Sequence, residues 1–288
     1  THGGWLEESA DMRQQEYLTE SKPGVPTGFP TLDKVTNGAM PGCLYLIAAG
    51  TGEGKSVMLL NIAHNMWTAG KKVLFISVEN YYDDVMRRFT SRDAEVFESD
   101  LKRGVLNPDQ RRRLAESIAR QKAGSKRLRV ESRTSNCTPA YVEQKINDMF
   151  PEKFDAVFVD YLQIMDLQVK NSRQDARDQY FGDLAKELRR VAKEKHVPIF
   201  TAVQVNREGL KTKDESYSVA HIALSQQIAN HSDLVLSIRA LTPTKERVRG
   251  TVQMEASCAK NRNGAPGRFG ISANFSVMQM VEQTMGVV

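Results

Sequence analysis

The chain has 288 residues, of which 40% are hydrophobic and 26% are charged, and its formal net charge is +5. These values are ordinary for a globular domain, and the positive charge permits binding to a polyanion without requiring it. No apolar run reaches the ~20 residues that a membrane-spanning helix needs, so we expect a cytoplasmic protein with no membrane partner. The three cysteines lie far apart, which indicates reduced thiols rather than a disulfide framework or a zinc site.

The N-terminal part differs from the remainder: we expect a linker or docking segment over residues 1–24 and one domain over residues 25–288. The apolar side chains of the first segment are too few to form a core of their own. This segment is therefore either disordered or packed on another surface, for which a neighbouring subunit is one candidate. Pro23, Pro26 and Pro30 predict an extended, stiff course into the domain.

A glycine-rich turn lies between an apolar run and a helical pattern. Residues 44–49 predict a buried strand, and the apolar residues after position 56 recur at helical spacing. The candidate nucleotide-binding residues in this stretch are Gly50, Thr51, Gly52, Glu53, Gly54, Lys55, Ser56 and Val57. A strand–turn–helix unit of this kind typically binds phosphate through backbone N–H groups and the positive end of the helix.

Within this turn, Lys55 is expected to reach the β- and γ-phosphates of a nucleotide, and the Ser56 hydroxyl to bind Mg²⁺. Ala49 departs from the strict pattern, which has a glycine five residues before Gly54. A glycine-rich turn that binds no nucleotide is therefore the alternative interpretation of this stretch.

Apolar runs that alternate with helical patterns predict an α/β fold. The predicted strands beyond the turn occupy residues 72–78, 128–130, 155–160, 197–203, 234–238, 251–258 and 269–275. The first four alternate with helices, which indicates a mostly parallel sheet covered on both faces. The last three follow one another without long helices, so we expect some of them to be antiparallel at the C-terminal edge.

Three polar residues follow predicted strands at their carboxyl ends: Glu79, Asp160 and Gln204. Open parallel sheets bind ligands at this edge, so we expect these side chains beside the glycine-rich turn. Asp160 would bind Mg²⁺ directly or through its water shell, and Glu79 would orient or deprotonate an attacking water. Gln204 would sense the γ-phosphate. Taken singly, each residue has a simpler interpretation as a surface charge or a turn residue.

Lys260 and Arg262 stand two residues apart on a predicted strand and therefore share one face of it. Arginine is suited to stabilise the charge on a transferring phosphoryl group, and such a side chain can come from a neighbouring subunit. A basic hairpin with a tight turn at Asn263 and Gly264 is the alternative.

The order of these motifs resembles the RecA-like P-loop NTPase motor domain of DnaB-type replicative helicases, with a phage member as one candidate. The similarity extends from about residue 25 to about residue 275. Its most specific stretch, residues 160–165, is similar to the family's Mg²⁺-binding motif. The other matching stretches are residues 27–42, 50–63, 75–79, 104–109, 197–207 and 259–264.

This resemblance implies a homo-oligomeric ring, expected to be a hexamer, that hydrolyses ATP or another NTP with Mg²⁺. The ring would translocate 5′ to 3′ on single-stranded DNA and unwind forked duplex DNA in a bacterial or phage-infected cytoplasm. Glu79 would then be the catalytic base, and Lys260 and Arg262 would act on the neighbour's nucleotide. Primase or loader proteins are the implied partners, and residues 1–20 would correspond to the family's linker helix.

The chain departs from the family where its DNA contacts are expected. The family's channel-lining motif is reduced to a trace, with residues 223–226 in place of an arginine–glutamate–serine–glycine cluster. Our DNA-contact candidates are therefore Lys211, Lys213 and Ser225, and the two lysines could equally be solvated loop charges. Two other functions stay open: a RecA-like recombinase or other filament-forming ATPase, and a nucleotide-binding assembly protein without enzymatic activity.

Overall fold

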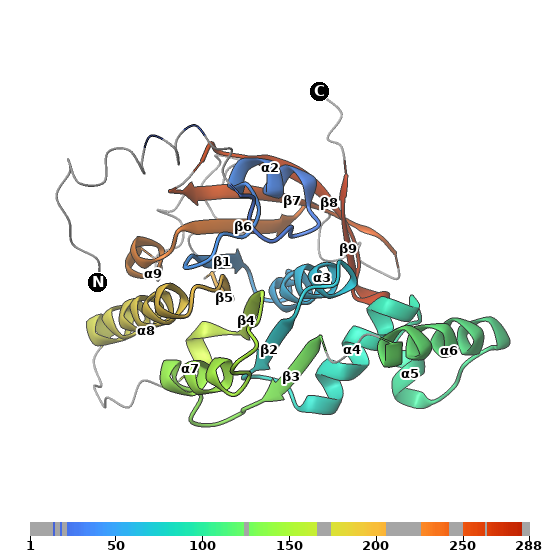
Figure 1. The fold of residues 1–288 in the computed structure, drawn as a ribbon. Coiled ribbons are helices and arrows are strands. Elements are labelled where there is room, and N and C mark those ends of the chain that lie inside the picture. Colours follow the sequence, from blue (N-terminus) through green and yellow to red (C-terminus); the bar gives the residue numbers. More distant parts are fainter. Residues whose placement is uncertain are drawn as a thin grey trace.

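The computed structural model describes residues 14, 18, 22–123, 127–165, 174–205, 226–241, 250–262 and 264–283. Within these ranges one sheet of nine strands organises the chain, in the order β3-β2-β4-β5-β1-β6-β7-β8-β9 (Figure 1). The pairings from β3 to β6 are parallel, and those from β6 to β9 are antiparallel. The predicted fold class, including the antiparallel C-terminal edge, is confirmed.

Strands β1 to β8 overlap the stretches that the sequence predicts as strands. The strands are β1 (Leu44–Ala49), β2 (Val73–Ser77), β3 (Leu128–Ser132), β4 (Ala156–Asp160), β5 (Ile199–Gln204), β6 (Leu234–Ala240), β7 (Val252–Asn261), β8 (Arg268–Asn274) and β9 (Gln279–Gln283). Every residue of β1, β2 and β4 is buried, as expected for central strands that are covered on both faces. The last strand, β9, was not predicted.

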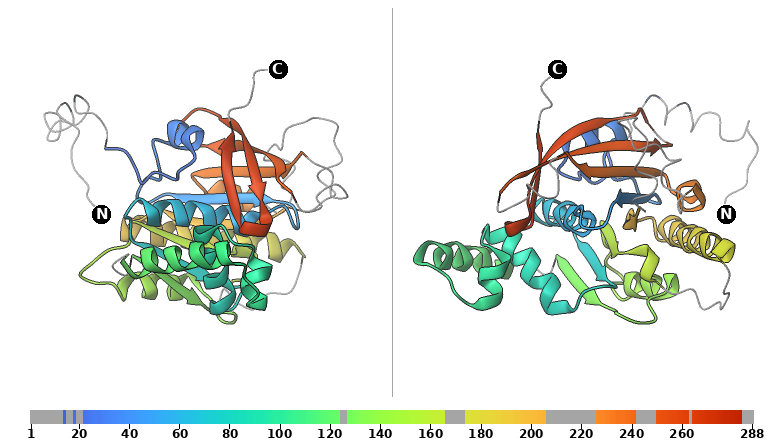
Figure 2. Two further views of the ribbon diagram at one scale, coloured as in Figure 1. Left: turned by 90° about the vertical axis from the view of Figure 1, so that its right-hand side faces the viewer. Right: turned by 180° about the vertical axis from the view of Figure 1, so that it is seen from behind.

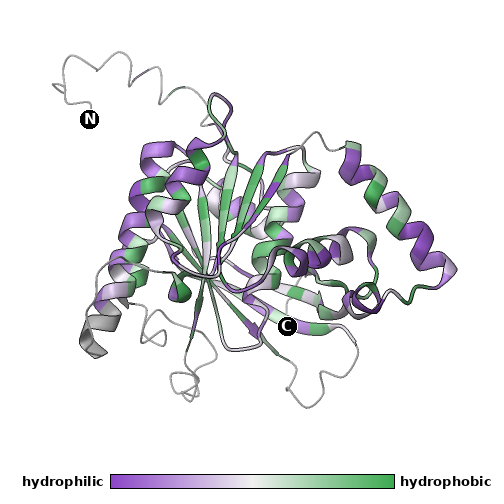
Figure 3. Ribbon diagram, turned by 90° about the horizontal axis from the view of Figure 1, so that it is seen from below, coloured by the Kyte–Doolittle hydropathy of each residue, from purple (hydrophilic) through white to green (hydrophobic). Residues whose placement is uncertain are grey.

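Helices cover both faces of the sheet (Figures 1 and 2). They are α2 (Pro30–Thr36), α3 (Lys55–Thr68), α4 (Tyr82–Ala94), α5 (Glu98–Arg103), α6 (Pro108–Ala123), α7 (Pro139–Asn147), α8 (Gln174–Lys195) and α9 (Gln226–His231), with short 3₁₀ turns η1 (Leu162–Ile164) and η5 (Phe275–Val277). The core under α2, α3 and α4 is separate from the core under α7, α8 and α9. Figure 3 shows apolar strands at the centre and polar helix surfaces outside.

The alternation of side chains along β1 divides these two cores. Tyr45 and Ile47 point to the α3 side, whereas Leu44 and Leu46 point to the α8 side. On the α3 side an aromatic row crosses the sheet, because the Phe200 ring centroid lies 4.7 Å from that of Tyr45 and 4.8 Å from that of Phe158. Aromatic pairs of this kind add about 0.5–1.5 kcal/mol each beyond the area that they bury.

The entry to the domain differs from the prediction. Pro30 does not extend the chain but begins α2, because proline is favourable at the first position of a helix. The preceding turn is held by Asp33, whose carboxylate accepts hydrogen bonds from the backbone N–H groups of Thr27 (2.7 Å) and Gly28 (3.1 Å). Most of the predicted linker or docking segment lies outside the described residues.

None of the helices in the described ranges has the length and apolar character that would let it cross a membrane.

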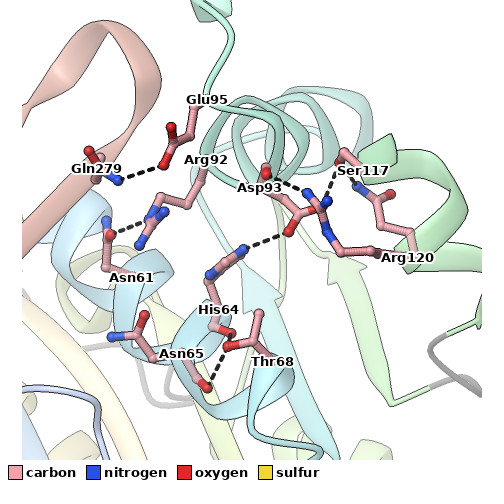
Figure 4. Close-up of polar contacts among 11 residues, drawn as sticks. Asn61, His64, Asn65, Thr68, Arg92, Asp93, Glu95, Ser117, Arg120 and Gln279 are labelled. Carbon is pink, nitrogen blue, oxygen red and sulfur yellow. Dashed lines mark hydrogen bonds and ion pairs between the residues drawn. The ribbon is translucent and has the colours of Figure 1, made fainter. Parts of the chain in front are cut away.

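The side chain of Asn61, on α3, makes four hydrogen bonds, of which the one to Arg92 of α4 is drawn in Figure 4. Its amide nitrogen donates to the carbonyls of Val57 and Met278, both at 2.8 Å. Its oxygen accepts from Arg92 Nε at 2.8 Å and from the Met280 backbone N–H at 3.0 Å. Since Asn61 is completely buried, these bonds fix β9 and α4 to the helix that follows the glycine-rich turn.

We predict that Asn61→Ala lowers the free energy of unfolding by about 3 kcal/mol, because it leaves several buried polar groups unpaired. Asn65→Ala is the matched control, since Asn65 lies one turn further on and donates one hydrogen bond, to the Thr27 carbonyl at 3.1 Å. The control should lose about 1 kcal/mol. Urea denaturation measures both, and equal losses would contradict this account of Asn61.

Candidate nucleotide-binding site

The candidate site lies where four neighbouring parallel strands end. In the sheet order β2-β4-β5-β1, Ser77 at the end of β2 is the register partner of Asp160 at the end of β4, and Ala49 at the end of β1 is the register partner of Gln204 at the end of β5. The glycine-rich turn leaves β1 at this edge and enters α3. The structure therefore brings Lys55, the predicted polar residues at the strand ends and the turn to one edge of the sheet.

The turn has its glycines where the backbone requires them. Gly52 and Gly54 have positive φ angles of 74° and 86°, which residues with a Cβ rarely adopt. Gly54 is the N-cap of α3, and Glu53 accepts a hydrogen bond from the Gly50 N–H at 3.2 Å. Ala49, in contrast, is a buried residue of β1 paired with Gln204, so the departure from the strict pattern falls inside the strand.

Lys55 lies over an aromatic ring that the sequence analysis did not single out. Its Nζ is 4.1 Å from the centroid of the Tyr161 ring, a cation–π distance. Tyr161 follows Asp160 directly, so the residue after β4 holds the lysine at the mouth of the turn. The signal was present in the sequence as the tyrosine of the motif at 160–165, but nothing in the pattern assigned it a contact.

Ser56 and Asp160, the two predicted Mg²⁺ ligands, are in direct contact. The Ser56 hydroxyl donates to Asp160 Oδ1 at 2.9 Å. Burial raises the pKa of Asp160 to about 6, although the Ser56 hydrogen bond and Lys55 lower it. A divalent cation would favour the charged carboxylate, and Mg²⁺ typically takes one or two protein oxygens in addition to phosphate and water. These residues fit such an ion.

Glu79 is exposed just beyond the end of β2. Its negative charge contributes to the raised pKa of Asp160 and to that of Tyr161, for which burial is the larger cause in each case. The carboxylate thus lies within electrostatic reach of Asp160 while still facing solvent. An exposed carboxylate in this place can accept a proton from a water molecule.

Gln204 connects β5 to the turn, because its side-chain amide donates to Thr51 Oγ1 at 2.8 Å. Its backbone is clamped by Gln163, a residue that the sequence analysis did not single out. Gln163 accepts from the Gln204 N–H at 2.6 Å and donates to the Gln204 carbonyl at 2.9 Å. The motif that carries Asp160 therefore also fixes the backbone of Gln204.

Lys260 and Arg262 do not lie with the other predicted residues. Lys260 donates to the Ala229 carbonyl and Arg262 to the Asn230 carbonyl, both at the end of α9. Two causes lower the pKa of Lys260 to about 8: burial, which is the larger, and the positive charge of the neighbouring Arg262. Asn261, between these two residues, pairs with Leu234 of β6, which in turn pairs with Tyr45 near the start of β1. The glycine-rich turn, in contrast, follows the end of β1.

Three predicted residues, Lys211, Lys213 and Ser225, lie outside the described residues, as does Asn263 of the predicted tight turn. Val57, in the first turn of α3, is half-buried and its carbonyl accepts from Asn61. Among the described residues there is no cluster of three or more histidine, cysteine or acidic side chains that could hold a metal. The pair Ser56 and Asp160 is therefore the metal candidate that this part of the chain offers.

A family model described as the DnaB-like helicase C terminal domain matches residues 24–282. The chain belongs to this DnaB-like family. The replicative DNA helicase DnaB of Leifsonia xyli subsp. xyli (strain CTCB07) is 26% identical over 261 residues, which are 88% of this chain and 55% of that protein. DnaB of Haemophilus influenzae (strain ATCC 51907 / DSM 11121 / KW20 / Rd) is 27% identical over 255 residues, 87% and 53% of the two chains.

This DnaB-like chain thus spans about half the length of these relatives. Among solved structures, an isolated ATPase domain superposes with a TM-score of 0.84 at 20% identity, covering 98% of this chain and 100% of that one. The structure of a DnaB-like replicative helicase, described together with its interactions with primase, superposes with a TM-score of 0.80 at 20% identity. The match covers 97% of this chain and 67% of that one. These likenesses confirm the fold.

In this DnaB-like domain, the glycine-rich turn rests on the C-terminal end of the fold. A Cβ built on Gly54 would lie 2.6 Å from Met280 Cε and 2.7 Å from Phe275 Cε1. A Cβ built on Gly52 would meet nothing within 4 Å. The two glycines therefore share a left-handed backbone and differ in their surroundings.

We predict that Gly54→Ala destabilises the protein by about 2 kcal/mol more than Gly52→Ala does. Both variants carry about 1 kcal/mol of backbone strain, but only the first forces Phe275 and Met280 to move. Chemical denaturation of the two variants beside the wild type measures this difference. If the two variants were equally stable, the contact between the turn and the C-terminal strand would be unimportant.

Proposed function

We propose that this chain is the ATP-driven motor of a replicative DNA helicase. It assembles as a hexameric ring, hydrolyses ATP between subunits, translocates 5′ to 3′ on single-stranded DNA and unwinds the duplex at a fork. The observation that carries the proposal is the convergence of Lys55, Ser56, Glu79, Asp160 and Gln204 at one edge of the sheet. Membership of the DnaB-like family supports it.

In this mechanism the backbone N–H groups of the turn and Lys55 bind the phosphates of the nucleotide. Lys55 leaves the ring of Tyr161 to do so. Ser56 and Asp160 would hold Mg²⁺, and the ion would neutralise charge on the phosphates. Glu79 accepts a proton from the attacking water, whose oxygen bonds to the γ-phosphorus as the bond to ADP breaks.

Gln204 links the state of the γ-phosphate to the residues that follow β5. Its amide bonds Thr51 of the turn, and its backbone is fixed by Gln163, so a change at the turn is carried to the residues after 204. We propose that DNA is bound there, with Lys211, Lys213 and Ser225 as the candidates. Charged contacts of this kind would make DNA affinity fall as salt rises.

Lys260 and Arg262 complete the site of a neighbouring subunit in this proposal. They are level with the amino end of β1, and the six residues of that strand span roughly 17 Å. They are therefore poorly placed to reach the turn of their own chain. An arginine supplied by a neighbour is a recurring way to stabilise phosphoryl transfer and to couple sites around a ring.

We propose that primase or loader proteins are partners of this chain. One solved DnaB-like helicase interacts with primase, and this chain spans about half the length of its relatives.

The proposal predicts ATP-dependent unwinding of a fork that carries a 5′ single-stranded tail, with little unwinding when only a 3′ tail is present. Native mass measurement with a nucleotide analogue should give a hexamer. Unwinding of neither substrate, together with open filaments that pair strands, would instead indicate a RecA-like recombinase. Nucleotide binding without turnover in the presence of DNA would indicate an assembly protein.

Glu79→Gln should lower kcat for ATP hydrolysis by about 100-fold or more while nucleotide binding persists, because the carboxamide cannot accept a proton. Asp83→Asn is the matched control, since it removes an exposed carboxylate in the first turn of α4. Steady-state phosphate release on single-stranded DNA measures both variants. Unchanged hydrolysis in Glu79→Gln would rule out Glu79 as the base.

Arg262→Ala and Lys55→Ala should each abolish DNA-stimulated hydrolysis, and a mixture of the two should recover part of it. Recovery follows because some interfaces in a mixed ring combine an intact turn with an intact Arg262. A single-chain site would give no recovery at any mixing ratio. Titrating one variant into the other at constant total protein, with exchange of subunits verified by mass, makes the two outcomes distinct.

A further inference from the structure

A pocket lies between α3, α4, α6 and β3, away from the strand ends that form the candidate nucleotide-binding site. It has a volume of about 140 Å³. Its lining residues are His64, Trp67, Met86, Phe89, Asp93, Gln121, Arg127 and Leu128. None of these residues takes part in the proposed mechanism, and His64 lies nine residues after Lys55 on the same helix.

His64 presents a hydrogen-bond acceptor that no described residue uses. The side chain is 8% exposed, and its Nε2 contacts Asp93 Oδ1 at 3.2 Å (Figure 4). Asp93 is held as a carboxylate: burial raises its pKa, but hydrogen bonds from His64 and Ser117 lower it to about 2. A carboxylate only accepts, so the proton of this bond is on Nε2.

The other ring nitrogen, Nδ1, is therefore a bare acceptor. Burial lowers the pKa of His64, which keeps the ring neutral near pH 7. Nδ1 is buried and has no hydrogen-bond partner among the described residues. A buried acceptor left unpaired is costly, so a ligand with an N–H or O–H group is favoured beside it.

Arg127 supplies the complementary group. Its Nε is likewise buried without a hydrogen-bond partner in the described part of the chain, and an Nε–H can only donate. Trp67, Phe89 and Leu128 provide apolar walls. The buried, unpaired side-chain atoms of the lining are thus one acceptor and one donor. A few polar groups among flat and aliphatic surfaces are the usual make-up of a small-molecule site.

We propose that this pocket binds a neutral, single-ring aromatic carboxamide. Its N–H group would donate to His64 Nδ1, its carbonyl would accept from Arg127 Nε, and its ring would lie between Trp67 and Phe89. The size agrees, because a cavity of roughly 150 Å³ holds one benzene ring. A carboxylate would suit Arg127 but would meet the charge of Asp93 and leave the His64 acceptor unpaired.

The test uses benzamide as the probe, with benzoate and toluene as comparison compounds, on the 288-residue chain. Titrations followed by protein NMR, with the Trp67 indole signal as the reporter, should give saturable benzamide binding in about the millimolar range. Benzoate and toluene should bind about tenfold more weakly, because each lacks one or both hydrogen bonds.

Two variants separate the polar contact from simple filling of the cavity. Arg127→Met keeps the aliphatic stem but removes the donor, and should weaken benzamide about tenfold. Met86→Trp should abolish binding by occupying the space. Arg129→Met is the matched control, because it removes an arginine of β3 that does not line the pocket. The guanidinium of Arg129 contacts Glu131 Oε1 at 2.7 Å, and the variant should bind benzamide like the wild type.

Thermal unfolding of each variant establishes that it is folded before binding is compared. No saturable benzamide binding to the wild type would overturn the proposal and leave the pocket as a water site. Toluene binding as tightly as benzamide, or equal losses in Arg127→Met and Arg129→Met, would also overturn it. The binding test involves no ATP hydrolysis, so its outcome is independent of the motor function proposed above.

Discussion

Parallel pairing of β1 with β5 on one side and β6 on the other is the constraint on which the molecule depends. Parallel strands that pair in register end at the same edge, so Ala49 and Gln204 are direct neighbours. Parallel pairing of β2 with β4 likewise brings Ser77 level with Asp160. No loop has to travel far to assemble the candidate site. Its polar groups sit on strand ends whose positions are set by buried backbone hydrogen bonds and by the aromatic row on the α3 side.

The same constraint explains which parts of the fold could be predicted from the sequence. Central parallel strands are buried on both faces, so β1, β2 and β4 appear as unbroken apolar runs. Strand β9 is short, and its exposed Val281 alternates with buried Met280, so it has no such signal. Helix α5 has no buried residue, so it also lacks an apolar periodic signal. Neither element has a continuous buried stretch. Whether its residues are buried depends on neighbours that are distant in sequence, so local patterns could not predict it.

Within the candidate site, sequence patterns located the groups whose chemistry is distinctive and missed those defined by contact. Lysine, serine and aspartate at motif positions point to phosphate and metal whatever surrounds them. Tyr161 and Gln163 act through geometry: one lies under Lys55, and the other hydrogen-bonds the backbone of Gln204. The partners of both are distant in sequence, so their roles could not be predicted from local spacing.

Asp233 connects the start of β1 to the segment that carries Arg262. Its buried carboxylate accepts from the backbone N–H of Leu44 at 3.0 Å and from Arg189 of α8 at 2.6 Å and 3.1 Å. Its backbone carbonyl accepts from the Arg262 N–H at 2.9 Å. One residue therefore anchors the start of β1, the helix that covers it and the base of Arg262. Arg262 is therefore held at the opposite end of β1 from the glycine-rich turn of its own chain, and this placement supports its proposed action on the phosphate of a neighbouring subunit.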